Sequence, residues 1–421
     1  MTKIVVLKEQ RANELRVAAT AETVKKFISL GVEVEIESGA GETSEVSNND
    51  YETAGAKISA DRDALLASAN IIIGVQPDLS VAEIKKLKSG TSVVGQFSPY
   101  SNVSNIERFA ENNISAFAME FIPRITRAQT MDVLSSQSNI AGYKAVLDAF
   151  NISKKVIPMM MTAAGTIKPA KVLVLGAGVA GLQAIATAKR MGAVVSAFDV
   201  RPAVKEQVES LGAKFIEVES EEAQKSETTG GYAKEMSEEY KRKQAELIHQ
   251  VAKEQDIIIT TALIPGRPAP ILIPEAIVKD MKAGSIIVDL AVSAGGNCPL
   301  SELNEVVVKH GVTIIGYENF PSRVPLDASA LYARNIFNFV STLVDKETKA
   351  LIINQEDEII KGCLLTKDGK IVNKALLDFM GKQSADKKPV TEAMPPKETS
   401  LDKPHLKNKI KDKNKEGAAN D

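Results

Sequence analysis

A glycine-rich segment near the middle of the chain constrains its fold more than any other feature. An apolar run over residues 172–175 leads into Gly176, Gly178 and Gly181, a helical pattern follows, and the next apolar run ends at Asp199. In a βαβ unit of this kind the first glycine permits a tight turn, the second lets the backbone approach a pyrophosphate, and the third lets the helix pack closely on the strand. The segment predicts a dinucleotide site; the alternative is a glycine-rich turn in an ordinary α/β fold.

The expected ligand contacts follow from the geometry of such a unit. The pyrophosphate is expected at the N-terminus of the helix, where unpaired N–H groups and the helix dipole favour an anion. The acid that ends the second strand, Asp199, is expected to accept hydrogen bonds from the adenosine ribose. The cofactor-binding residues predicted in the turn itself are Gly176, Gly178, Val179, Ala180 and Gly181.

The composition is that of a globular protein and argues against several classes of function. The chain has 421 residues, of which 44% are hydrophobic and 25% charged, and its formal net charge of −2 argues against a nucleic-acid partner. Cys298 and Cys363 cannot form a disulfide framework, and the histidines lack ligand spacing, so we predict no metal site.

The N-terminus has no signal-peptide pattern. The apolar stretch 172–188 contains the three glycines and is shorter than a span of ~20 residues, so we expect no membrane crossing.

Short apolar runs alternate with helical patterns along the chain, which predicts an α/β fold with parallel sheets covered by helices. We expect two Rossmann-like domains with a cleft between them, the first made of residues 1–137 and 327–380 and the second of residues 138–326. The segment 358–369 is expected to close the first domain as a sheet-like piece. Residues 381–421 contain ten lysines, seven acids, four prolines and no aromatic residue, which is typical of a disordered tail with solvated lysines rather than a membrane-surface segment.

The polar segment 121–139 contains two arginines, an acid and several amides and hydroxyls, just after a strand. One interpretation is a surface loop that leads into a helix capped by a serine. The other is a ligand-binding loop in which Arg124 pairs with Asp132, while Gln129 and Ser135 offer hydrogen bonds to a ligand ring and ribose. Binding residues concentrate in loops of this kind at the mouth of a cleft. Composition alone leaves both interpretations open.

Three further segments of the second domain bear on the site. The segment 228–234 carries paired glycines beside a tyrosine, which suggests a mobile lid, with a disordered surface loop as the alternative. Residues 261–267 follow a buried strand, and strand ends of this kind surround the cofactor in a doubly wound sheet. Residues 159–161 are three methionines, which we expect to fill space in the core.

Taken together, these motifs resemble the NAD(H)-binding component of proton-translocating nicotinamide nucleotide transhydrogenase, in the form where that component is a separate soluble subunit. The resemblance covers residues 1–380 and is most specific over residues 123–139, PRITRAQTMDVLSSQSN. Its other motifs are residues 176–181, 199–202, 230–234, 260–266 and 288–298. The family relationship also implies membership of the alanine dehydrogenase/transhydrogenase superfamily.

The resemblance implies roles for individual residues. Those expected to hold the nicotinamide and its ribose, and therefore assigned as catalytic, are Arg124, Gln129, Asp132 and Ser135. Those expected elsewhere along the cofactor are Asp199, Val200 and Arg201 at the adenosine ribose, and Gly231 and Tyr232 in a loop that closes over NAD(H). Thr261 is also expected to bind the cofactor, and Ala262 and Leu263 are expected to do so through backbone contacts. The negative charge of Asp199 is expected to exclude NADP(H), an effect that Arg201 could soften.

The implied function is direct hydride transfer from NADH on this chain to NADP⁺ on a partner, which needs no general acid or base. The NADP(H) is expected on an NADP(H)-binding beta subunit, and a membrane-spanning subunit would couple the transfer to proton movement. The resemblance also implies a homodimer that is cytoplasmic and peripherally associated with the inner membrane through its partner subunits.

Two alternatives come from other classes. Alanine dehydrogenase, a fold relative, uses a lysine, a histidine and an aspartate on pyruvate and ammonium, where this chain has Val75-Gln76-Pro77, Gly95-Gln96-Phe97 and Ser293 and retains only Arg16. Without those groups the protonation of a keto-acid oxygen has no obvious agent. A non-catalytic NAD(H)-binding protein would keep the glycine turn but would have no use for the polar segment.

Overall fold

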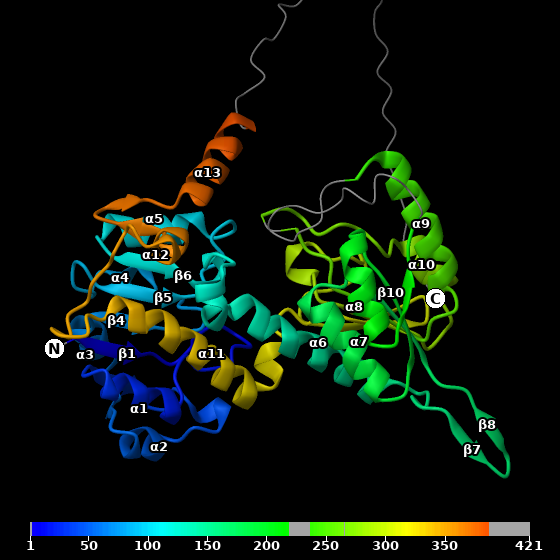
Figure 1. The fold of residues 1–421 in the computed structure, drawn as a ribbon, viewed down its shortest axis with the longest axis horizontal. Coiled ribbons are helices and arrows are strands. Elements are labelled where there is room, and N and C mark those ends of the chain that lie inside the picture. Colours follow the sequence, from blue (N-terminus) through cyan, green and yellow to red (C-terminus); the bar gives the residue numbers. More distant parts are fainter. Residues whose placement is uncertain (1, 219–235, 265, 387–421) are drawn as a thin grey trace, which may run out of the picture. The chain divides into compact units, whose positions relative to one another are not determined.

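The computed structural model describes residues 2–218, 236–264 and 266–386, and its compact unit ends at Phe379. This unit contains two separate sheets, one of six strands and one of seven, each covered by helices (Figure 1). The expected α/β fold with two parallel sheets is confirmed.

The first sheet is parallel throughout and has the strand order β3-β2-β1-β4-β5-β6. Its strands are β1 (Lys3–Val6), β2 (Glu33–Glu37), β3 (Lys57–Ser59), β4 (Ile71–Ile73), β5 (Ser92–Gly95) and β6 (Ser115–Ala118). The helices between them are α1 (Ala21–Ser29), α2 (Asn48–Thr53), α3 (Arg62–Ser68), α4 (Val81–Ile84) and α5 (Val103–Glu111). Because helices cover both faces of such a sheet, its central strands are nearly continuous apolar runs.

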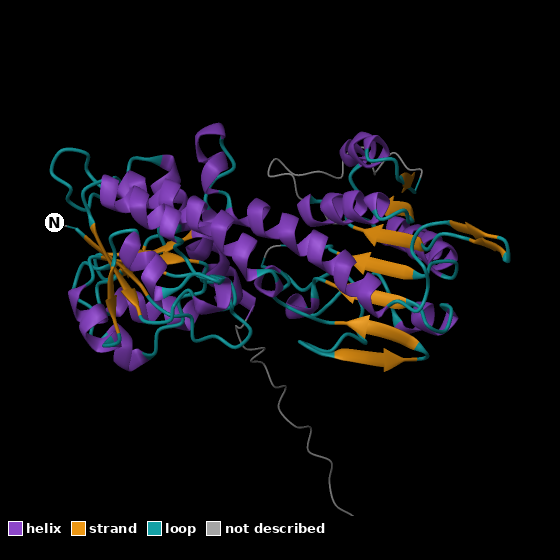
Figure 2. Cartoon of the chain, turned by 90° about the horizontal axis from the view of Figure 1, so that it is seen from below, coloured by secondary structure: helices purple, strands orange, loops and turns teal. Residues whose placement is uncertain are grey.

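The second sheet repeats this order as β11-β10-β9-β12-β13-β15-β14, with β14 antiparallel at one edge. Its strands are β9 (Lys171–Leu175), β10 (Val194–Phe198), β11 (Lys214–Ile216), β12 (Ile257–Thr260), β13 (Ile286–Asp289), β14 (Val306–Lys309) and β15 (Val312–Ile315). Its helices are α7 (Val179–Arg190), α8 (Lys205–Ser210), α9 (Glu238–Ala252) and α10 (Glu275–Asp280). Val172 and Val174 face one hydrophobic core, whereas Leu173 and Leu175 face another, so both sides of the sheet are covered (Figure 2).

Two long helices connect the sheets. Helix α6 (Val133–Ile152) contacts α7, β12 and β13 of the second sheet, and α11 (Pro325–Val340) contacts α1 and β5 of the first. Proline suits the first turn of α11 because the missing N–H would have no partner in the helix there. The hydroxyl of Tyr332 on α11 donates to the carbonyl oxygens of Gly74 and Val75 at 3.0 and 3.2 Å, which anchors the returning helix on the end of β4.

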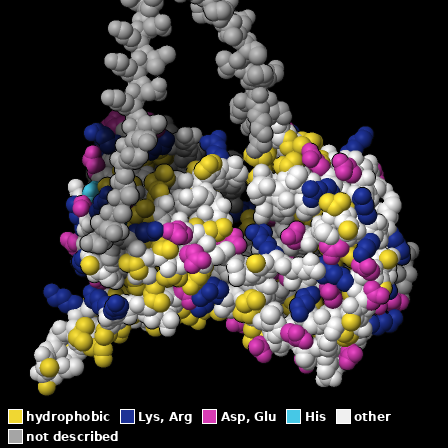
Figure 3. Space-filling view, turned by 180° about the vertical axis from the view of Figure 1, so that it is seen from behind, with side chains coloured by type: hydrophobic (Ala, Val, Ile, Leu, Met, Phe, Trp, Pro, Cys, Tyr) yellow, Lys and Arg dark blue, Asp and Glu magenta, His cyan; other side chains and the backbone are white. Residues whose placement is uncertain are grey.

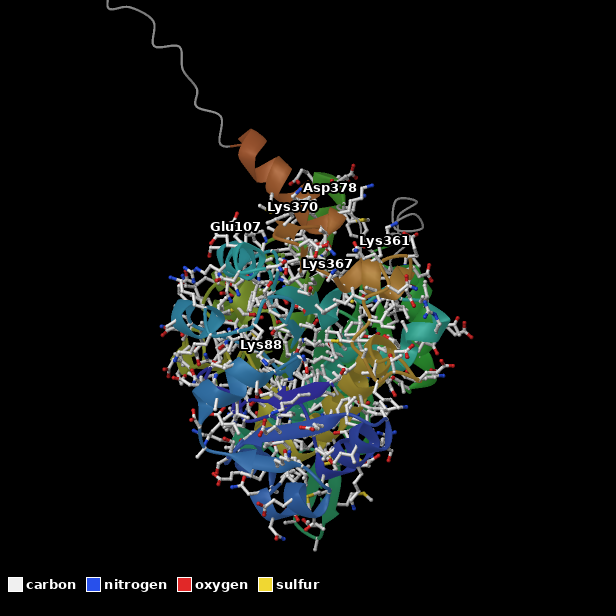
Figure 4. All side chains as sticks on the ribbon, turned by 90° about the vertical axis from the view of Figure 1, so that its left-hand side faces the viewer. Lys88, Glu107, Lys361, Lys367, Lys370 and Asp378 are labelled. Carbon is white, nitrogen blue, oxygen red and sulfur yellow. The ribbon has the colours of Figure 1, made fainter. Side chains whose placement is uncertain are left out.

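The piece that closes the first sheet differs from the expectation. Residues 358–363 form the helix α12 (Glu358–Cys363), so the prediction of a sheet-like segment is wrong there. The side chain of Asp357 accepts a hydrogen bond from the N–H of Ile359 at 2.9 Å and starts the helix, and Ile359 and Ile360 then pack into the first core. Only β16 (Thr366–Lys367) and β17 (Lys370–Ile371) pair as a hairpin. This hairpin contacts α5. Figure 4 labels Lys367 and Lys370 of the hairpin and Glu107 of α5.

The first positions of the segment expected to be a tail, residues 381–386, are helical. Helix α13 (Lys374–Asp386) continues through the first positions of the segment assigned to the tail, and Phe379 on this helix packs against Tyr100 with ring centroids 4.9 Å apart. Residues 387–421 lie outside the described part of the chain.

Residues 159–161 are not core residues. Met160–Thr162 (β7) and Gly165–Ile167 (β8) form a hairpin, and Met159, Met160 and Met161 are 60%, 45% and 76% exposed. The expectation that these methionines fill space in the core is therefore wrong. The hairpin projects from the second sheet with apolar side chains on its surface (Figures 1 and 3).

Within the described ranges, no helix combines the length and apolar character needed to cross a bilayer. The stretch 172–188 that most resembled a span divides into β9 and α7 around the glycine turn.

Candidate functional site

The glycine turn lies at the point where the strand order of the second sheet reverses, between β9 and β12. Ligands of doubly wound sheets bind in the crevice at the carboxyl ends of the strands flanking such a point. Gly176 follows β9 with a φ of +100°, a conformation that favours glycine. A Cβ atom on Gly181 would lie 1.8 Å from the carbonyl oxygen of Gly176, so helix α7 can start this close to the strand only with glycine there.

Gly178 differs from the other two glycines. A Cβ atom added to it would have no heavy atom within 4 Å. The residue caps α7 from an extended conformation without a side-chain hydrogen bond, and Val179 at the start of the helix is 40% exposed. The N–H groups at the start of α7 therefore face space that a phosphate group could occupy.

Asp199 lies directly after β10 and faces the same turn. One oxygen of its carboxylate accepts from the N–H of Ala177 at 2.7 Å and from Nη2 of Arg201 at 2.8 Å. The other oxygen accepts from the backbone N–H and Nε of Arg201, both at 2.9 Å. The side chain is 6% exposed, so this carboxylate is fixed beside the glycine turn with a guanidinium against it.

The end of β12 completes this crevice. The hydroxyl of Thr261 donates to the carbonyl oxygen of Gly176 at 3.0 Å. The N–H of Ala262 donates to Oδ1 of Asn297 at 3.1 Å, and Nδ2 of Asn297 donates to the carbonyl oxygen of Ala262 at 2.9 Å. Leu263 is 48% exposed. The segments predicted from the sequence thus meet, but the N–H of Ala262 and the hydroxyl of Thr261 already bond protein atoms.

The polar segment before α6 is built around Asp132. One carboxylate oxygen of Asp132 accepts from the N–H of Ser135 at 2.9 Å and the other from its hydroxyl at 2.5 Å, so Asp132 is the N-cap of α6. A serine cap, as in the surface-loop interpretation, is wrong. Arg124 and Gln129 are exposed, and Gln129 lies in the 3₁₀ turn η3 (Thr126–Met131).

Neighbouring elements hold this segment in place. Nδ2 of Asn335 and Nδ2 of Asn338, both on α11, donate to the carbonyl oxygen of Thr130 at 2.8 and 3.1 Å. Arg127 pairs with Asp357, the cap of α12, at 2.6 Å. The loop that carries Gln129 is therefore tied to two helices of the first sheet.

Helix α6 carries this segment to the glycine turn. A Cβ atom on Gly142 of α6 would lie 2.0 Å from the carbonyl oxygen of Ala180, so the two helices cross in backbone contact. Asn139 of α6 and Val179 of α7 line the same open groove. The polar segment and the predicted pyrophosphate turn are thus linked through one rigid helix, while Gly231 and Tyr232 lie outside the described residues.

The first sheet has the same strand order, but its corresponding crevice is filled. At the ends of β1 and β4 the carboxylate of Glu9 accepts from the N–H groups of Val75 and Gln76 at 2.6 and 3.2 Å, and burial raises its pKa to about 7. The space left beside Glu9 is about 10 Å³, which is room for one water molecule. This space is far smaller than a nucleotide.

The guanidinium of Arg16, the residue retained from the alanine dehydrogenase pattern, donates hydrogen bonds to other side chains of this chain. Its Nε and Nη2 donate to the two carboxylate oxygens of Glu14 at 2.8 and 2.6 Å, and Nη1 donates to Oε1 of Gln137 at 2.8 Å. The residue is 3% exposed. Gln76, from the segment that replaces Lys-Glu-Pro, donates to Glu14 at 3.1 Å and belongs to the same cluster.

Sequence reasoning missed Asp289 and Asn297 as structural determinants of the crevice. Asn297 is completely buried and binds the backbone of Ala262 from a position 35 residues away. The motif Gly295-Gly296-Asn297-Cys298 was visible as a signature, but only its paired glycines hinted at a turn beside the site.

The fold and this crevice are those of a dinucleotide-binding α/β protein. The crevice is open where the strand order of the second sheet reverses, whereas the side chain of Glu9 occupies the corresponding place in the first sheet. The chain belongs to the alanine dehydrogenase/PNT family. Residues 5–141 match the model described as "Alanine dehydrogenase/PNT, N-terminal domain", and residues 145–374 match "Alanine dehydrogenase/PNT, C-terminal domain".

Its relatives place it in the transhydrogenase branch of this family. The chain is 52% identical to the first part of NAD(P) transhydrogenase subunit alpha of Rhodospirillum rubrum, over 89% of this chain and 98% of the relative. It is 47% identical to the protein of the same description from Rickettsia prowazekii, over 88% and 96%. A crystal structure of transhydrogenase from Sinorhizobium meliloti superposes with a TM-score of 0.79 at 48% identity, over 88% of this chain and all of that one.

The alanine dehydrogenase branch is more distant. Alanine dehydrogenase of Mycolicibacterium smegmatis is 26% identical over 87% of this chain and 94% of its own length. A solved L-alanine dehydrogenase with a TM-score of 0.76 and 24% identity shares the fold. The transhydrogenase interpretation is therefore favoured over that of alanine dehydrogenase.

Proposed function

We propose that this chain is the NAD(H)-binding subunit of a proton-translocating transhydrogenase and that it passes hydride between NADH and NADP⁺ held by a partner subunit. The observation that carries the proposal is the meeting of Gly176, Asp199 and Thr261 at the switch point of the second sheet. It occurs in a chain 52% identical to a protein described as a portion of transhydrogenase subunit alpha.

The residues of the crevice fit a dinucleotide. The open backbone at Gly178 and the N-terminus of α7 would receive the pyrophosphate, together with Val179, Ala180 and Gly181. Asp199 would accept from the hydroxyls of the adenosine ribose, next to Val200 and Arg201. NAD(H), when bound, supplies or accepts the hydride.

The polar segment would act at the nicotinamide end. The proposed residues are Arg124, Gln129, Asp132 and Ser135, with Gly231, Tyr232, Thr261, Ala262 and Leu263 as further contacts. The hydrogen bonds between Asp132 and Ser135, and the ties of Thr130 to α11, fix the backbone that presents Gln129. Direct hydride transfer depends on positioning of the two nicotinamides and on exclusion of water rather than on proton transfer. A loop held in place by these bonds would supply the positioning.

The partners follow from the need for a second nicotinamide. An NADP(H)-binding beta subunit would dock over the crevice, and a membrane-spanning subunit would couple the reaction to proton movement. We propose a cytoplasmic subunit, held at the inner membrane by these partners. The proposed domain limits are residues 1–137 with 327–380 and residues 138–326, followed by a tail from residue 381.

A homodimer is also proposed. The hairpin β7–β8 supports it, because Met161 is 76% exposed at a site that projects from the second sheet, and apolar surface of this kind favours protein contacts.

The test follows NADH absorbance with NADP⁺ or an analogue as acceptor, with and without the partner NADP(H)-binding subunit. Rapid oxidation only in the presence of the partner is expected. A reaction with pyruvate and ammonium serves as the control. Turnover of these two substrates by the chain alone would overturn the proposal in favour of an amino-acid dehydrogenase, and tight NADH binding without any transfer would favour a non-catalytic binding protein.

A further inference from the structure

Asn297 forms hydrogen bonds with both the beginning and the end of the backbone segment that follows β12. Its side chain bonds both polar backbone groups of Ala262, and its Nδ2 also donates to the carbonyl oxygen of Pro270 at 2.7 Å. Its own carbonyl oxygen accepts from the N–H groups of Leu272 and Ile273 at 2.9 and 3.0 Å. One residue therefore fixes where this backbone leaves the sheet and where it returns.

Asp289, the last residue of β13, fixes Asn297 in turn. One oxygen of the Asp289 carboxylate accepts from the N–H of Asn297 at 3.2 Å, from the N–H of Ala291 at 3.0 Å and from the hydroxyl of Thr260 at 3.1 Å. The other accepts from the N–H of Cys298 at 3.0 Å and from the hydroxyl of Ser301 at 2.8 Å.

A carboxylate that is completely buried requires compensation of this kind, and here five donors supply it. The turn before Asn297 also depends on Asp289. Gly296 has a φ of +80°, and a Cβ atom there would lie 2.7 Å from an oxygen of Asp289. The carboxylate of Asp289 therefore packs closely against the turn that precedes Asn297 and requires glycine at position 296.

The bonds of Asn297 decide what Ala262 can offer a ligand. The N–H of Ala262 is already donated to Asn297, whereas its carbonyl oxygen has two lone pairs and uses one of them for Nδ2. The carbonyl oxygen of Ala262 therefore keeps one lone pair for a further hydrogen bond, and the amide of Asn297 fixes the orientation of this backbone.

We propose that Asn297, oriented by Asp289, is a positioning residue that aims the Ala262 backbone at the cofactor; this inference rests on the proposed function. Asn297 is completely buried, so the role proposed for it is indirect. It acts by holding Ala262 and the neighbouring Leu263 at the mouth of the crevice.

Asn297→Asp tests the proposal with little change in shape. The carboxylate still accepts from the N–H of Ala262 but can no longer donate to the carbonyl oxygens of Ala262 and Pro270, which it instead repels. We expect NADH to bind roughly tenfold or more weakly, since about two hydrogen bonds are lost. Binding is measured by calorimetry and by NADH fluorescence on the full chain.

Asn373→Asp is a matched control. Asn373 is 3% exposed, donates through Nδ2 to the carbonyl oxygens of Gly362 and Leu364, and accepts from the N–H of Leu376, so its side chain makes the same kinds of bonds. It lies in the piece that closes the first sheet. Both variants are expected to lose similar unfolding stability, whereas only Asn297→Asp is expected to lose NADH affinity.

The pH dependence gives a second readout. A protonated carboxyl group can donate one hydrogen bond, so NADH affinity of the Asn297→Asp variant should recover relative to the native chain as pH falls. If this variant does not fold, Ser301→Ala removes one donor from Asp289 and should weaken NADH binding by about two- to fivefold.

The outcomes separate this inference from the proposed function. A native chain that does not bind NADH overturns both. A native chain that binds NADH, with Asn297→Asp binding it equally well or with Asn373→Asp losing the same affinity, overturns the positioning role alone. Unchanged affinity in Ser301→Ala would overturn the role assigned to Asp289.

Discussion

The hydroxyl of Thr261 donates a hydrogen bond to the carbonyl oxygen of Gly176 at 3.0 Å across 85 positions of sequence. This bond joins the two strand ends that flank the switch point of the second sheet. A Cβ atom on Gly176 would lie 2.6 Å from the same hydroxyl oxygen, so the turn can pack this closely on the end of β12 only with glycine at position 176.

Thr261→Val keeps the shape of the side chain and removes this bond. We expect the free energy of unfolding to fall by about 1 kcal/mol and NADH affinity to fall several-fold, because the turn loses a lateral support. Urea unfolding and calorimetry measure the two effects. Thr187→Val removes a hydroxyl bonded within α7 to Gln183 and should leave NADH affinity unchanged. Equal affinity in both variants would contradict the role of Thr261.

Gly178 and Gly181 should respond oppositely to alanine. Gly181→Ala forces a methyl group against the Gly176 carbonyl and should destabilise the fold by about 3 kcal/mol or more. Gly178→Ala meets no protein atom within 4 Å, so stability should be preserved while NADH affinity falls by at least about tenfold, because the methyl group occupies the ligand's space. Unimpaired NADH binding by the Gly178→Ala variant would argue against a pyrophosphate at this turn.

Asp199→Ala tests discrimination between the two dinucleotides. Removing the carboxylate also removes the acceptor to which Nε and Nη2 of Arg201 donate, so a 2′-phosphate would no longer meet an anion there. We expect the affinity for NADPH to rise at least about tenfold, because a juxtaposed like charge costs several kcal/mol. Competition binding measures the change, and the double variant with Arg201→Ala should lose most of the gain. Continued rejection of NADPH by Asp199→Ala would disprove the charge argument.

Glu120 makes stability depend on pH. Burial raises its pKa from 4.5 to about 7, and its one bonded oxygen accepts from the N–H groups of Phe97 and Ser98, both at 2.7 Å. The folded carboxyl group therefore holds its proton in a range where the unfolded one has lost it. Its contribution favours folding most below about pH 4.5 and is lost as pH rises to about 7.

Glu120→Gln should remove this dependence. The amide keeps the acceptor for Phe97 and Ser98 and never ionises, so the variant should match the native chain near pH 4.5 and exceed its stability by roughly 3 kcal/mol above pH 7. Chemical unfolding across this range provides the measurement. Glu107→Gln on the exposed side of α5 is the control (Figure 4). Parallel pH profiles for the Glu120→Gln variant and the native chain would contradict the assignment.

The hairpin β7–β8 should control association. Replacing Met159 and Met161 by serine removes side chains that are 60% and 76% exposed, and we expect the fraction of dimer to fall without loss of stability. Light scattering at several concentrations measures this. Leu303→Ser, at a residue 52% exposed beside β14, is the comparison. An unchanged dimer in the methionine variant would place the interface elsewhere.

The fold could largely be predicted because its signals are local. The glycines at 176, 178 and 181, and the acid at 199, follow strands and a helix within one βαβ unit, and each residue type answers a steric or electrostatic need of that unit. The alternation of apolar runs and helical patterns likewise predicted two parallel sheets. Asp132 was identified in the polar segment, although its observed role as the cap of α6 was not anticipated.

What could not be predicted depends on distant residues. Ile359 and Ile360 favour a strand by composition, but the cap from Asp357 and their burial in the first core produce a helix. The methionines at 159–161 look like core residues until the hairpin is seen to leave the sheet. Asn297 reaches Ala262 across 35 positions, and such a contact leaves no periodic trace in the sequence.

The chain contains two sheets of the same strand order, and the carboxylate of Glu9 occupies in one of them the place that a ligand would take in the other. A duplicated architecture would be expected to hold two nucleotides. The expectation that follows is one dinucleotide per chain, because the carboxylate of Glu9 already bonds the N–H groups of Val75 and Gln76 in the first sheet, whereas the backbone at Gly178 in the second sheet is open.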